Sequence, residues 1–139
     1  MKSTLKHFKK GLLAYNSGDF AAALHEWNAL AEQGEAKAQN SLGMMYSKGL
    51  GVTQDYKKAV EWYLKAAEQE FAPARYNLGV RCFEGQGVPQ DYEESINWFR
   101  KAAEQGVAHA QSNLGSMYSK GLGAPKDLKE AVNWYRKAA

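Results

Sequence analysis

A 36-residue pattern recurs through most of this chain, and its period constrains the fold more than any other feature of the sequence. Trp62, for example, recurs as Trp98 and Trp134, each step being 36 residues. A fixed period of this length indicates one small supersecondary unit stacked on copies of itself, because each unit can bury its apolar face only against its neighbours. The chain is therefore expected to be a repeat protein, and stacks of this kind commonly form binding surfaces.

The composition supports an ordered protein and gives no charge that would select a particular partner. Of the 139 residues, 45% are apolar and 24% are charged, which fits a folded protein rather than a disordered one. The 18 basic and 15 acidic residues leave a net charge of +3, so no strong field is available to recruit nucleic acid or a membrane. Cys82 is the single cysteine, which excludes an intrachain disulfide.

The sequence shows no segment that we expect to insert into a membrane or to direct export. Nowhere do about 18 apolar residues follow one another, the length that a membrane-spanning helix needs. The lysines between Lys2 and Lys10 resemble the positive start of a signal peptide, but the apolar run from Leu12 to Tyr15 is too short. We therefore expect a cytoplasmic protein, while a secreted or periplasmic location stays open if a leader has been removed.

Each repeat carries the signals of two helices. In the repeat from 36 to 71, Ala38, Leu42 and Met45 lie at helical spacing, and glycines at 49 and 51 end the pattern. Asp55 then offers a side-chain acceptor to the free amides at the start of a second helix. In the later repeats a glutamate follows three residues after the aspartate, which predicts capping boxes formed by Asp91 with Glu94 and by Asp127 with Glu130.

Small and large residues recur at the expected contacts between helices. A glycine in a helix interior costs about 1 kcal/mol relative to alanine, so its recurrence in the first helix of each repeat predicts a close approach of the paired helices. The large aromatic residues of the second helix are expected to fill the space between one repeat and the next. The glycines are Gly43, Gly79 and Gly115, and the aromatic pairs are Trp62-Tyr63, Trp98-Phe99 and Trp134-Tyr135.

The two ends of the repeat array differ from its interior. Gly18-Asp19-Phe20 matches the start of a second helix at the same 36-residue offset, but the connection before it is shorter. Glu26 replaces the tryptophan, which suits a terminal repeat that meets solvent. The last repeat reaches Ala139 without a polar helix, which predicts a truncated repeat or an end that pairs with another chain. We expect a single repeat domain over residues 1–139, built from units 1–35, 36–71, 72–107 and 108–139.

These residues resemble the Sel-one-like repeat family, a branch of the tetratricopeptide-like helical repeats. The resemblance covers residues 36–139, and the segment from Gly11 to Ala31 is more similar to a plain tetratricopeptide repeat. Departures from the family pattern are few: Cys82 replaces a tyrosine, Ser95 an alanine and Leu128 an aromatic residue. The pattern is present in the second repeat as Ala38-x-x-x-Leu42-Gly43-x-x-Tyr46-x-x-Gly49-x-Gly51, then Asp55-Tyr56-x-x-Ala59-x-x-Trp62-Tyr63-x-x-Ala66-Ala67.

The resemblance implies an all-α fold, a right-handed α-α superhelix (solenoid) of antiparallel helix pairs that serves as a scaffold or adaptor for a protein or peptide. It also implies that the first helix of each pair lines the concave side, where its outward positions form a binding groove. Mapped onto this sequence, the partner-binding positions are Phe8, Leu12, Tyr15, Asn40, Met44, Ser47, Lys48, Tyr76, Val80, Phe83, Glu84, Ser112, Ser116, Ser119 and Lys120.

Tyr76, Val80 and Phe83 differ from the equivalent positions of the neighbouring repeats, which are mostly polar. The three residues have the three-to-four spacing of one helical face. An apolar patch at such positions indicates either a pocket for a partner or packing against the neighbouring first helix. The sequence leaves both interpretations open.

The sequence gives only weak signals for a catalytic or a metal site. Ser3-Thr4-Leu5-Lys6 fits the Ser-x-x-Lys pattern of penicillin-recognising enzymes, an activity linked to some relatives in this family, but the elements that complete that chemistry are missing. His7, His25 and His109 share no metal-ligand spacing with one another or with Cys82. We expect no enzyme, no cofactor and no metal. The alternatives are a penicillin-binding or β-lactamase-like hydrolase, and a weak nucleic-acid binder whose binding would depend steeply on salt.

The sequence therefore predicts a recognition module. We expect it to capture an extended or helical segment of another protein in the groove, with aromatic anchors supplying affinity. Neither nucleic acid nor a membrane is expected as a partner, and self-association through the uncapped C-terminal repeat is a further alternative.

Overall fold

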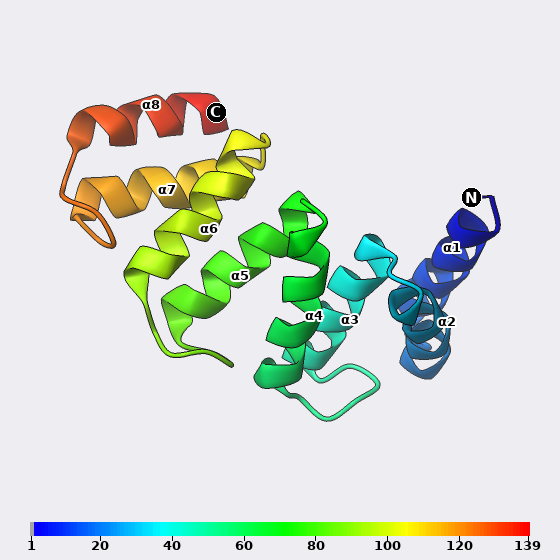
Figure 1. The fold of residues 1–139 in the computed structure, drawn as a ribbon. Coiled ribbons are helices and arrows are strands. Elements are labelled where there is room, and N and C mark those ends of the chain that lie inside the picture. Colours follow the sequence, from blue (N-terminus) through cyan, green and yellow to red (C-terminus); the bar gives the residue numbers. More distant parts are fainter. Residues whose placement is uncertain (1) are drawn as a thin grey trace. The chain divides into compact units, whose positions relative to one another are not determined.

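The computed structural model describes residues 2–139, which form eight α-helices and no β-strand (Figure 1). The predicted all-α fold is thus confirmed. The helices are α1 (Lys2–Asn16), α2 (Phe20–Glu32), α3 (Ala36–Lys48), α4 (Tyr56–Glu68), α5 (Ala72–Glu84), α6 (Tyr92–Glu104), α7 (Ala108–Lys120) and α8 (Leu128–Ala138).

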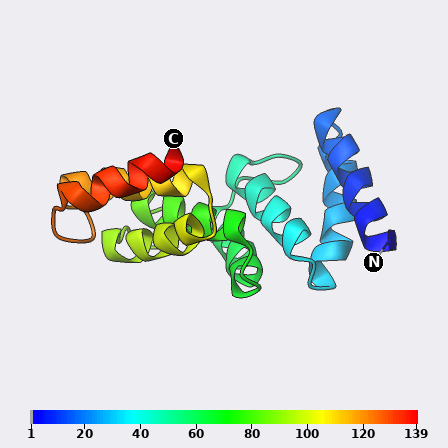
Figure 2. The same ribbon diagram turned by 90° about the horizontal axis from the view of Figure 1, so that it is seen from above.

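The described residues divide into two compact units, the first ending at Phe71 and the second beginning at Ala72. Within the first unit α1 packs on α2, α2 on α3 and α3 on α4; within the second, α5 to α8 pack in the same order. Figure 2 shows each helix folding back beside its predecessor inside a pair, as expected for helical hairpins. Each unit therefore buries its apolar surface between consecutive helices.

The second helix of each pair begins at an aspartate, as the sequence predicts. The Oδ1 atom accepts a hydrogen bond from the amide three residues on in every pair, the distance being 3.1 Å at Asp19, Asp55, Asp91 and Asp127. Asp127 also accepts from the amide of Lys129. Each cap satisfies an amide that the helix leaves without an intrahelical acceptor.

The second half of the predicted capping box is replaced by a longer-range bond. The glutamate of a capping box accepts from the amide of the cap residue, but these amides donate to a carbonyl at the end of the preceding helix. The Asp91 amide donates to Cys82 at 2.9 Å and the Asp127 amide to Tyr118 at 2.9 Å. The aspartate therefore starts its own helix and also fixes the loop that returns from the previous one.

In each helix pair an aromatic ring lies directly on a glycine of the partner helix. Tyr63 covers Gly43 and Phe99 covers Gly79 so closely that a β-carbon at either glycine would overlap the ring. Trp27 covers Gly11 in the same way in the first pair, and its Nε1 donates to the carbonyl of Phe8 at 3.2 Å. The close approach predicted from the glycines is therefore made by an aromatic ring.

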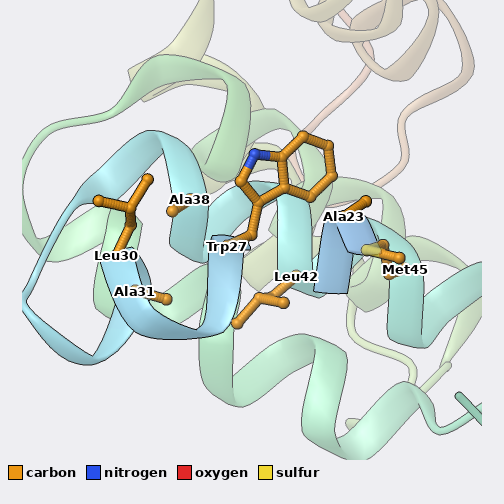
Figure 3. Close-up of a cluster of buried hydrophobic side chains, with 7 residues drawn as sticks. All are labelled: Ala23, Trp27, Leu30, Ala31, Ala38, Leu42 and Met45. Atoms are coloured by element: carbon orange, nitrogen blue, oxygen red, sulfur yellow. The ribbon is translucent and has the colours of Figure 1, made fainter. Parts of the chain in front are cut away.

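Each unit has its own core. In the first unit it is formed by residues of α2 and α3 that converge around Trp27 (Figure 3), namely Ala23, Trp27, Leu30, Ala31, Ala38, Leu42 and Met45. In the second unit the equivalent cluster lies between α6 and α7 and consists of Ile96, Phe99, Ala102, Ala103, Ala110, Leu114 and Met117. The burial of these clusters is the main stabilising contribution expected for each unit.

The aromatic pairs of the second helices do not fill space equally. The predicted packing between repeats is confirmed for Phe99, which clusters with Leu114 and Met117 of the next repeat, but it does not extend to every member of the pairs. Tyr63 and Phe99 are buried, each 2% exposed, and contact the glycine of their own helix pair. The preceding tryptophan is partly exposed, and the ammonium of Lys101 lies 4.7 Å from the ring centroid of Trp98. Tyr135 of the last pair is 42% exposed. Tight packing is thus made by the second aromatic residue within a pair.

Glu26 does not simply face solvent, as the terminal position had suggested. Its carboxylate lies 3.2 Å from Nδ1 of His7 and 3.3 Å from Nζ of Lys10, both in α1, and its side chain is 16% exposed. Partial desolvation raises the pKa of Glu26, but hydrogen bonds and charges from His7 and Lys10 outweigh it, so that the pKa lies below its ordinary value. The carboxylate joins α1 to α2.

Cys82 is 6% exposed and lies in α5, where other repeats carry a tyrosine. Burial, followed by the negative charges of Glu94 and Asp91, raises the pKa of its thiol to about 11. The thiol is therefore protonated at neutral pH, which makes Cys82 a poor nucleophile in the folded chain.

The contact between Gly79 and Phe99 can be tested by adding one methyl group. Gly79→Ala places a β-carbon 2.6 Å from two ring carbons of the buried Phe99, so the free energy of unfolding should fall by about 1 to 3 kcal/mol. Gly115→Ala is the matched control, because its β-carbon would lie 3.0 Å from the exposed, movable ring of Tyr135 and 3.1 Å from the carbonyl oxygen of Ala131, distances that shifts of a few tenths of an ångström relieve. Urea titration followed by circular dichroism should show a clearly smaller loss at Gly115. Equal losses would contradict the close contact.

Glu70 has a backbone conformation that favours glycine. Its φ is 60°, whereas the equivalent positions of the adjacent repeats are Gly34 and Gly106, both with φ 94°. Left-handed backbone costs a residue with a β-carbon about 1 to 2 kcal/mol, so Glu70→Gly should raise the free energy of unfolding by about 0.5 to 1 kcal/mol. Gly106→Ala should lower it by about 1 kcal/mol. Thermal and urea unfolding measure both changes, and a stabilising Gly106→Ala would refute the role of backbone strain here.

The reactivity of Cys82 should depend on folding and on pH. With its pKa raised from 9.0 to about 11, the folded chain has about 100-fold less thiolate near pH 8 than the unfolded chain. Reaction with a colorimetric disulfide reagent should be slow in buffer and fast in urea. The folded-state rate should keep rising toward pH 11, whereas the urea-unfolded rate should level off above pH 9. Equal rates at pH 8 would show that the thiol is not shielded.

Candidate functional site

The second unit contains a cavity of about 250 Å³. Residues of α5 and α7 form its two walls, and one residue each comes from α6 and from the loop after α7. It is lined by Tyr76, Val80, Phe83, Glu84, Phe99, Asn113, Ser116, Met117, Lys120 and Leu122. The structure therefore brings six of the predicted groove residues together: Tyr76, Val80, Phe83, Glu84, Ser116 and Lys120.

The α5 wall consists of Tyr76, Val80 and Phe83, which follow one another along a single helix face. The ring centroid of Tyr76 lies 5.8 Å from that of Phe99, and the centroid of Phe83 lies 5.0 Å from that of Tyr92. The three side chains are partly buried against the core between α6 and α7, yet they also line the cavity. The interpretation as packing against the neighbouring helix therefore agrees with the structure, while the interpretation as a partner pocket stays a prediction.

The floor of the cavity is formed by buried core residues, and its rim is charged. Phe99 and Met117 are each 2% exposed, so the base of the cavity is rigid and apolar. Glu84 and Lys120 are exposed at the carboxyl ends of α5 and α7 and contribute one negative and one positive charge. An apolar base with a few polar groups at the rim is the usual arrangement of a recognition site.

The α7 wall is more polar, although its hydroxyl groups are not all available. Asn113 and Ser116 line the cavity. The hydroxyl of Ser119 donates to the backbone carbonyl of Ser116 at 2.9 Å, inside its own helix. Ser112 is exposed but lies outside the cavity lining. Of the three predicted groove serines on α7, only Ser116 therefore lines the cavity.

In the first unit two of the four expected outward positions of α3 are inaccessible. Asn40 is 8% exposed and Ser47 is 9% exposed, so neither side chain is presented to solvent. The hydroxyl of Ser47 donates to the carbonyl of Met44 at 3.0 Å and lies 3.5 Å from the Tyr63 hydroxyl. Met44 is partly exposed and Lys48 is exposed. The prediction of outward-facing side chains is therefore wrong for Asn40 and Ser47.

The predicted positions of α1 divide between packing and exposure. The rings of Phe8 and Tyr15 lie 5.5 Å and 5.7 Å from the ring of Trp27, so both belong partly to the core of the first unit. Leu12 is 41% exposed. A second hollow, of about 230 Å³, lies beside Phe8 and is lined by Thr4, Leu5, Phe8, Glu35 and Lys37.

Sequence reasoning missed four residues of the cavity: Phe99, Asn113, Met117 and Leu122. Phe99 and Met117 have the spacing of core residues, and both are buried, as that spacing predicts. Their side chains also border the cavity. Leu122 lies between two glycines of the loop after α7, and Leu50 occupies the equivalent position two repeats earlier. The recurrence of leucine at this loop position was the sequence signal that could have identified Leu122.

No arrangement among the described residues indicates a metal or membrane function. Residues 2–139 contain no group of three or more histidine, cysteine, aspartate or glutamate side chains close enough to bind a metal ion. Among the helices described, none combines the length and apolar character needed to cross a bilayer. Ser3 and Lys6 lie exposed in the first turns of α1.

Comparison with protein families and solved structures agrees with the repeat pattern. The Sel1 repeat family matches residues 36–71, 72–107 and 108–139. A Sel1 repeat protein from Oxalobacter formigenes is 40% identical, with a TM-score of 0.90 over 95% of this chain and 54% of that chain. A protective antigen of uropathogenic Escherichia coli with an SLR fold is 41% identical, with a TM-score of 0.92 over 97% of this chain and 30% of that one.

A more distant likeness shows the fold alone. Cysteine rich protein B of Helicobacter pylori is 20% identical, with a TM-score of 0.62 over 78% of this chain and 92% of that chain. No curated protein gives a significant match. The chain spans about half or less of the length of the first two relatives. Sel1 repeat proteins are generally interaction scaffolds. Because the family pattern matches three successive repeats, this chain belongs to the Sel1 repeat family.

Proposed function

We propose that this chain is a protein-interaction scaffold whose second unit binds a partner polypeptide along α5 and α7. The observation that carries the proposal is the cavity lined by Tyr76, Val80, Phe83 and Ser116. Its walls come from the first helices of adjacent repeats, which the family resemblance assigns to partner binding. No residue is proposed to make or break a bond, and no feature of the described residues favours the hydrolase or the nucleic-acid alternative.

The dimensions of the cavity favour one anchoring side chain over a small-molecule ligand. Its volume of about 250 Å³ lies below the range of roughly 300 to 1,000 Å³ that is usual for small-molecule sites. A single large apolar side chain of a partner would fill such a space. Burying one such side chain contributes about 1.5 to 3 kcal/mol, which corresponds to an affinity change of about 10- to 150-fold.

The charged rim gives a means to fix the direction of a bound segment. Glu84 and Lys120 lie at the same end of the two walls, at the carboxyl ends of α5 and α7. A partner with an apolar anchor and charged residues beyond it would meet the apolar base and this rim together. Such polar contacts contribute more to orientation and specificity than to affinity.

A selection from a random peptide-display library tests the proposal even though the natural partner is unidentified. The full chain should enrich peptides that share a large apolar residue. Ser116→Arg should weaken their binding at least tenfold, because the long charged side chain would enter the apolar cavity. Fluorescence anisotropy with labelled peptides measures the dissociation constants.

Ser112→Arg is the matched control, because Ser112 lies one turn earlier on α7 and outside the cavity lining. It should change the dissociation constant by no more than about twofold, the effect expected of a surface substitution. Both variants should keep the helical circular dichroism of the parent chain. Enriched peptides that bind Ser116→Arg as tightly as the parent would contradict the proposed site.

A further inference from the structure

The residues that line the cavity in the second unit have counterparts in the first unit. Gly11 aligns with Gly79, since an aromatic ring covers each of them, and the later helices align at a distance of two repeats. Most lining residues then have a counterpart of the same chemical kind. These pairs, with the second unit first, are Tyr76 and Phe8, Val80 and Leu12, Phe83 and Tyr15, Phe99 and Trp27, Met117 and Met45, Lys120 and Lys48, and Leu122 and Leu50.

Ser116 departs from this correspondence, because Met44 lies at its position in the first unit. Met44 is partly buried, and its sulfur lies 4.0 Å from Nδ2 of Asn40, which is 8% exposed. A methionine side chain is longer than a serine side chain and ends in an apolar methyl group. The first unit therefore carries on α3 an apolar side chain that the second unit lacks on α7.

The lining of the cavity matches the chemistry of a methionine side chain. Tyr76, Phe83 and Phe99 contribute aromatic rings, with which a thioether sulfur makes favourable contacts. Methionine is also unbranched and adapts to irregular gaps between side chains. Such a side chain can enter between α5 and α7 without displacing Phe99, which is 2% exposed.

The rim of the cavity carries two charges that are available to a partner. Glu84 and Lys120 are exposed, and neither forms an ion pair within residues 2–139. Glu84 lies where the first unit has Asn16, so the negative charge belongs to this cavity and not to its counterpart. A segment with one basic and one acidic residue beside its anchor would complement both charges.

We propose, building on the function proposed above, that the cavity binds a methionine side chain of the partner polypeptide. One basic and one acidic residue flank this methionine and pair with Glu84 and Lys120. Ser116 determines the specificity, because it leaves free the position that Met44 occupies in the first unit. The partner thus supplies the thioether that α7 does not.

The peptide-display selection with the full chain tests the identity of the anchor. The enriched peptides should share a methionine rather than phenylalanine, tryptophan or leucine, with a basic and an acidic residue close to it. The most enriched peptide, labelled with a fluorophore, is the parent peptide for anisotropy. Serine in place of its methionine should raise the dissociation constant at least tenfold. Norleucine, which keeps the shape and lacks the sulfur, should stay within about tenfold of the parent peptide.

Ser116→Met fills the cavity from within and should have two effects. It should weaken binding of the parent peptide at least tenfold, because its side chain takes the place of the partner's methionine. It should also raise the urea midpoint of unfolding, because the new side chain buries apolar surface. Ser112→Met is the matched control, since Ser112 is exposed and lies outside the lining. It should change the dissociation constant by no more than about twofold and leave the midpoint nearly unchanged.

The charged rim is tested by removing one charge. Glu84→Gln should weaken binding of the parent peptide about two- to fivefold, as expected for the loss of one exposed ion pair. The effect should vanish with a peptide whose basic residue is replaced by glutamine. Glu104→Gln is the matched control, because Glu104 is exposed at the end of α6 but lies outside the lining. It should leave binding unchanged.

The results separate this assignment from the function on which it builds. An aromatic or branched aliphatic residue as the shared anchor would overturn the methionine assignment and leave the recognition site standing. Tight binding by Ser116→Met together with weak binding by Ser116→Arg would do the same. A selection that enriches no peptide would contradict the proposed function and the assignment with it.

Discussion

The contact of an aromatic ring with a glycine determines how closely the two helices of each pair approach. A glycine lowers intrinsic helix stability, so its presence in the first helix of each pair requires a compensating interaction. The rings of Trp27, Tyr63 and Phe99 provide it, because each is buried against the bare backbone of the partner helix. The chemistry of the ring varies between pairs, while the geometry is preserved. The glycine and the aromatic ring therefore act together to set the distance between the two helices.

This contact also positions the candidate site. Phe99 rests on Gly79 of α5, lies 5.8 Å from the ring of Tyr76 and forms part of the cavity floor. The core of the second unit and the proposed recognition surface thus share a side chain. A site built on such a residue is preorganised, because the packing that stabilises the helix pair also fixes the base of the cavity. Binding would then require little rearrangement of the floor.

The sequence predicted those features that a local or periodic signal encodes. The 36-residue period, the helix starts at Asp55 and Asp91, and the close approach at Gly79 each depend on residues of one repeat or on their recurrence. The accessibility of Ser47 was not predictable, because its hydroxyl can bond to solvent or to the carbonyl three residues earlier, and only the structure shows which. The pairing of Glu26 with α1 was missed because its carboxylate can face solvent or bond to His7 and Lys10, and only the structure shows which.

The shape of the cavity was beyond sequence analysis for a different reason. A cavity is the space that side chains from several helices leave unfilled. Its shape depends on their tertiary packing, which the repeat period does not specify. Tyr76, Val80 and Phe83 were recognised because they depart from their counterparts in other repeats. Met117 was not, because it matches its counterpart Met45 and has the pattern of an ordinary core residue.

The lysines of α1 have a consequence for assembly. Lys6 and Lys10 occupy the face that would have to meet the apolar side of α8 if copies of this chain were joined head to tail. Open-ended association of that kind produces fibres when the contact does not close on itself. Aligning Gly11 with Gly43 places these two lysines at the positions of Ala38 and Leu42, so stacking one copy on the next would bring their charges against an apolar surface and is disfavoured.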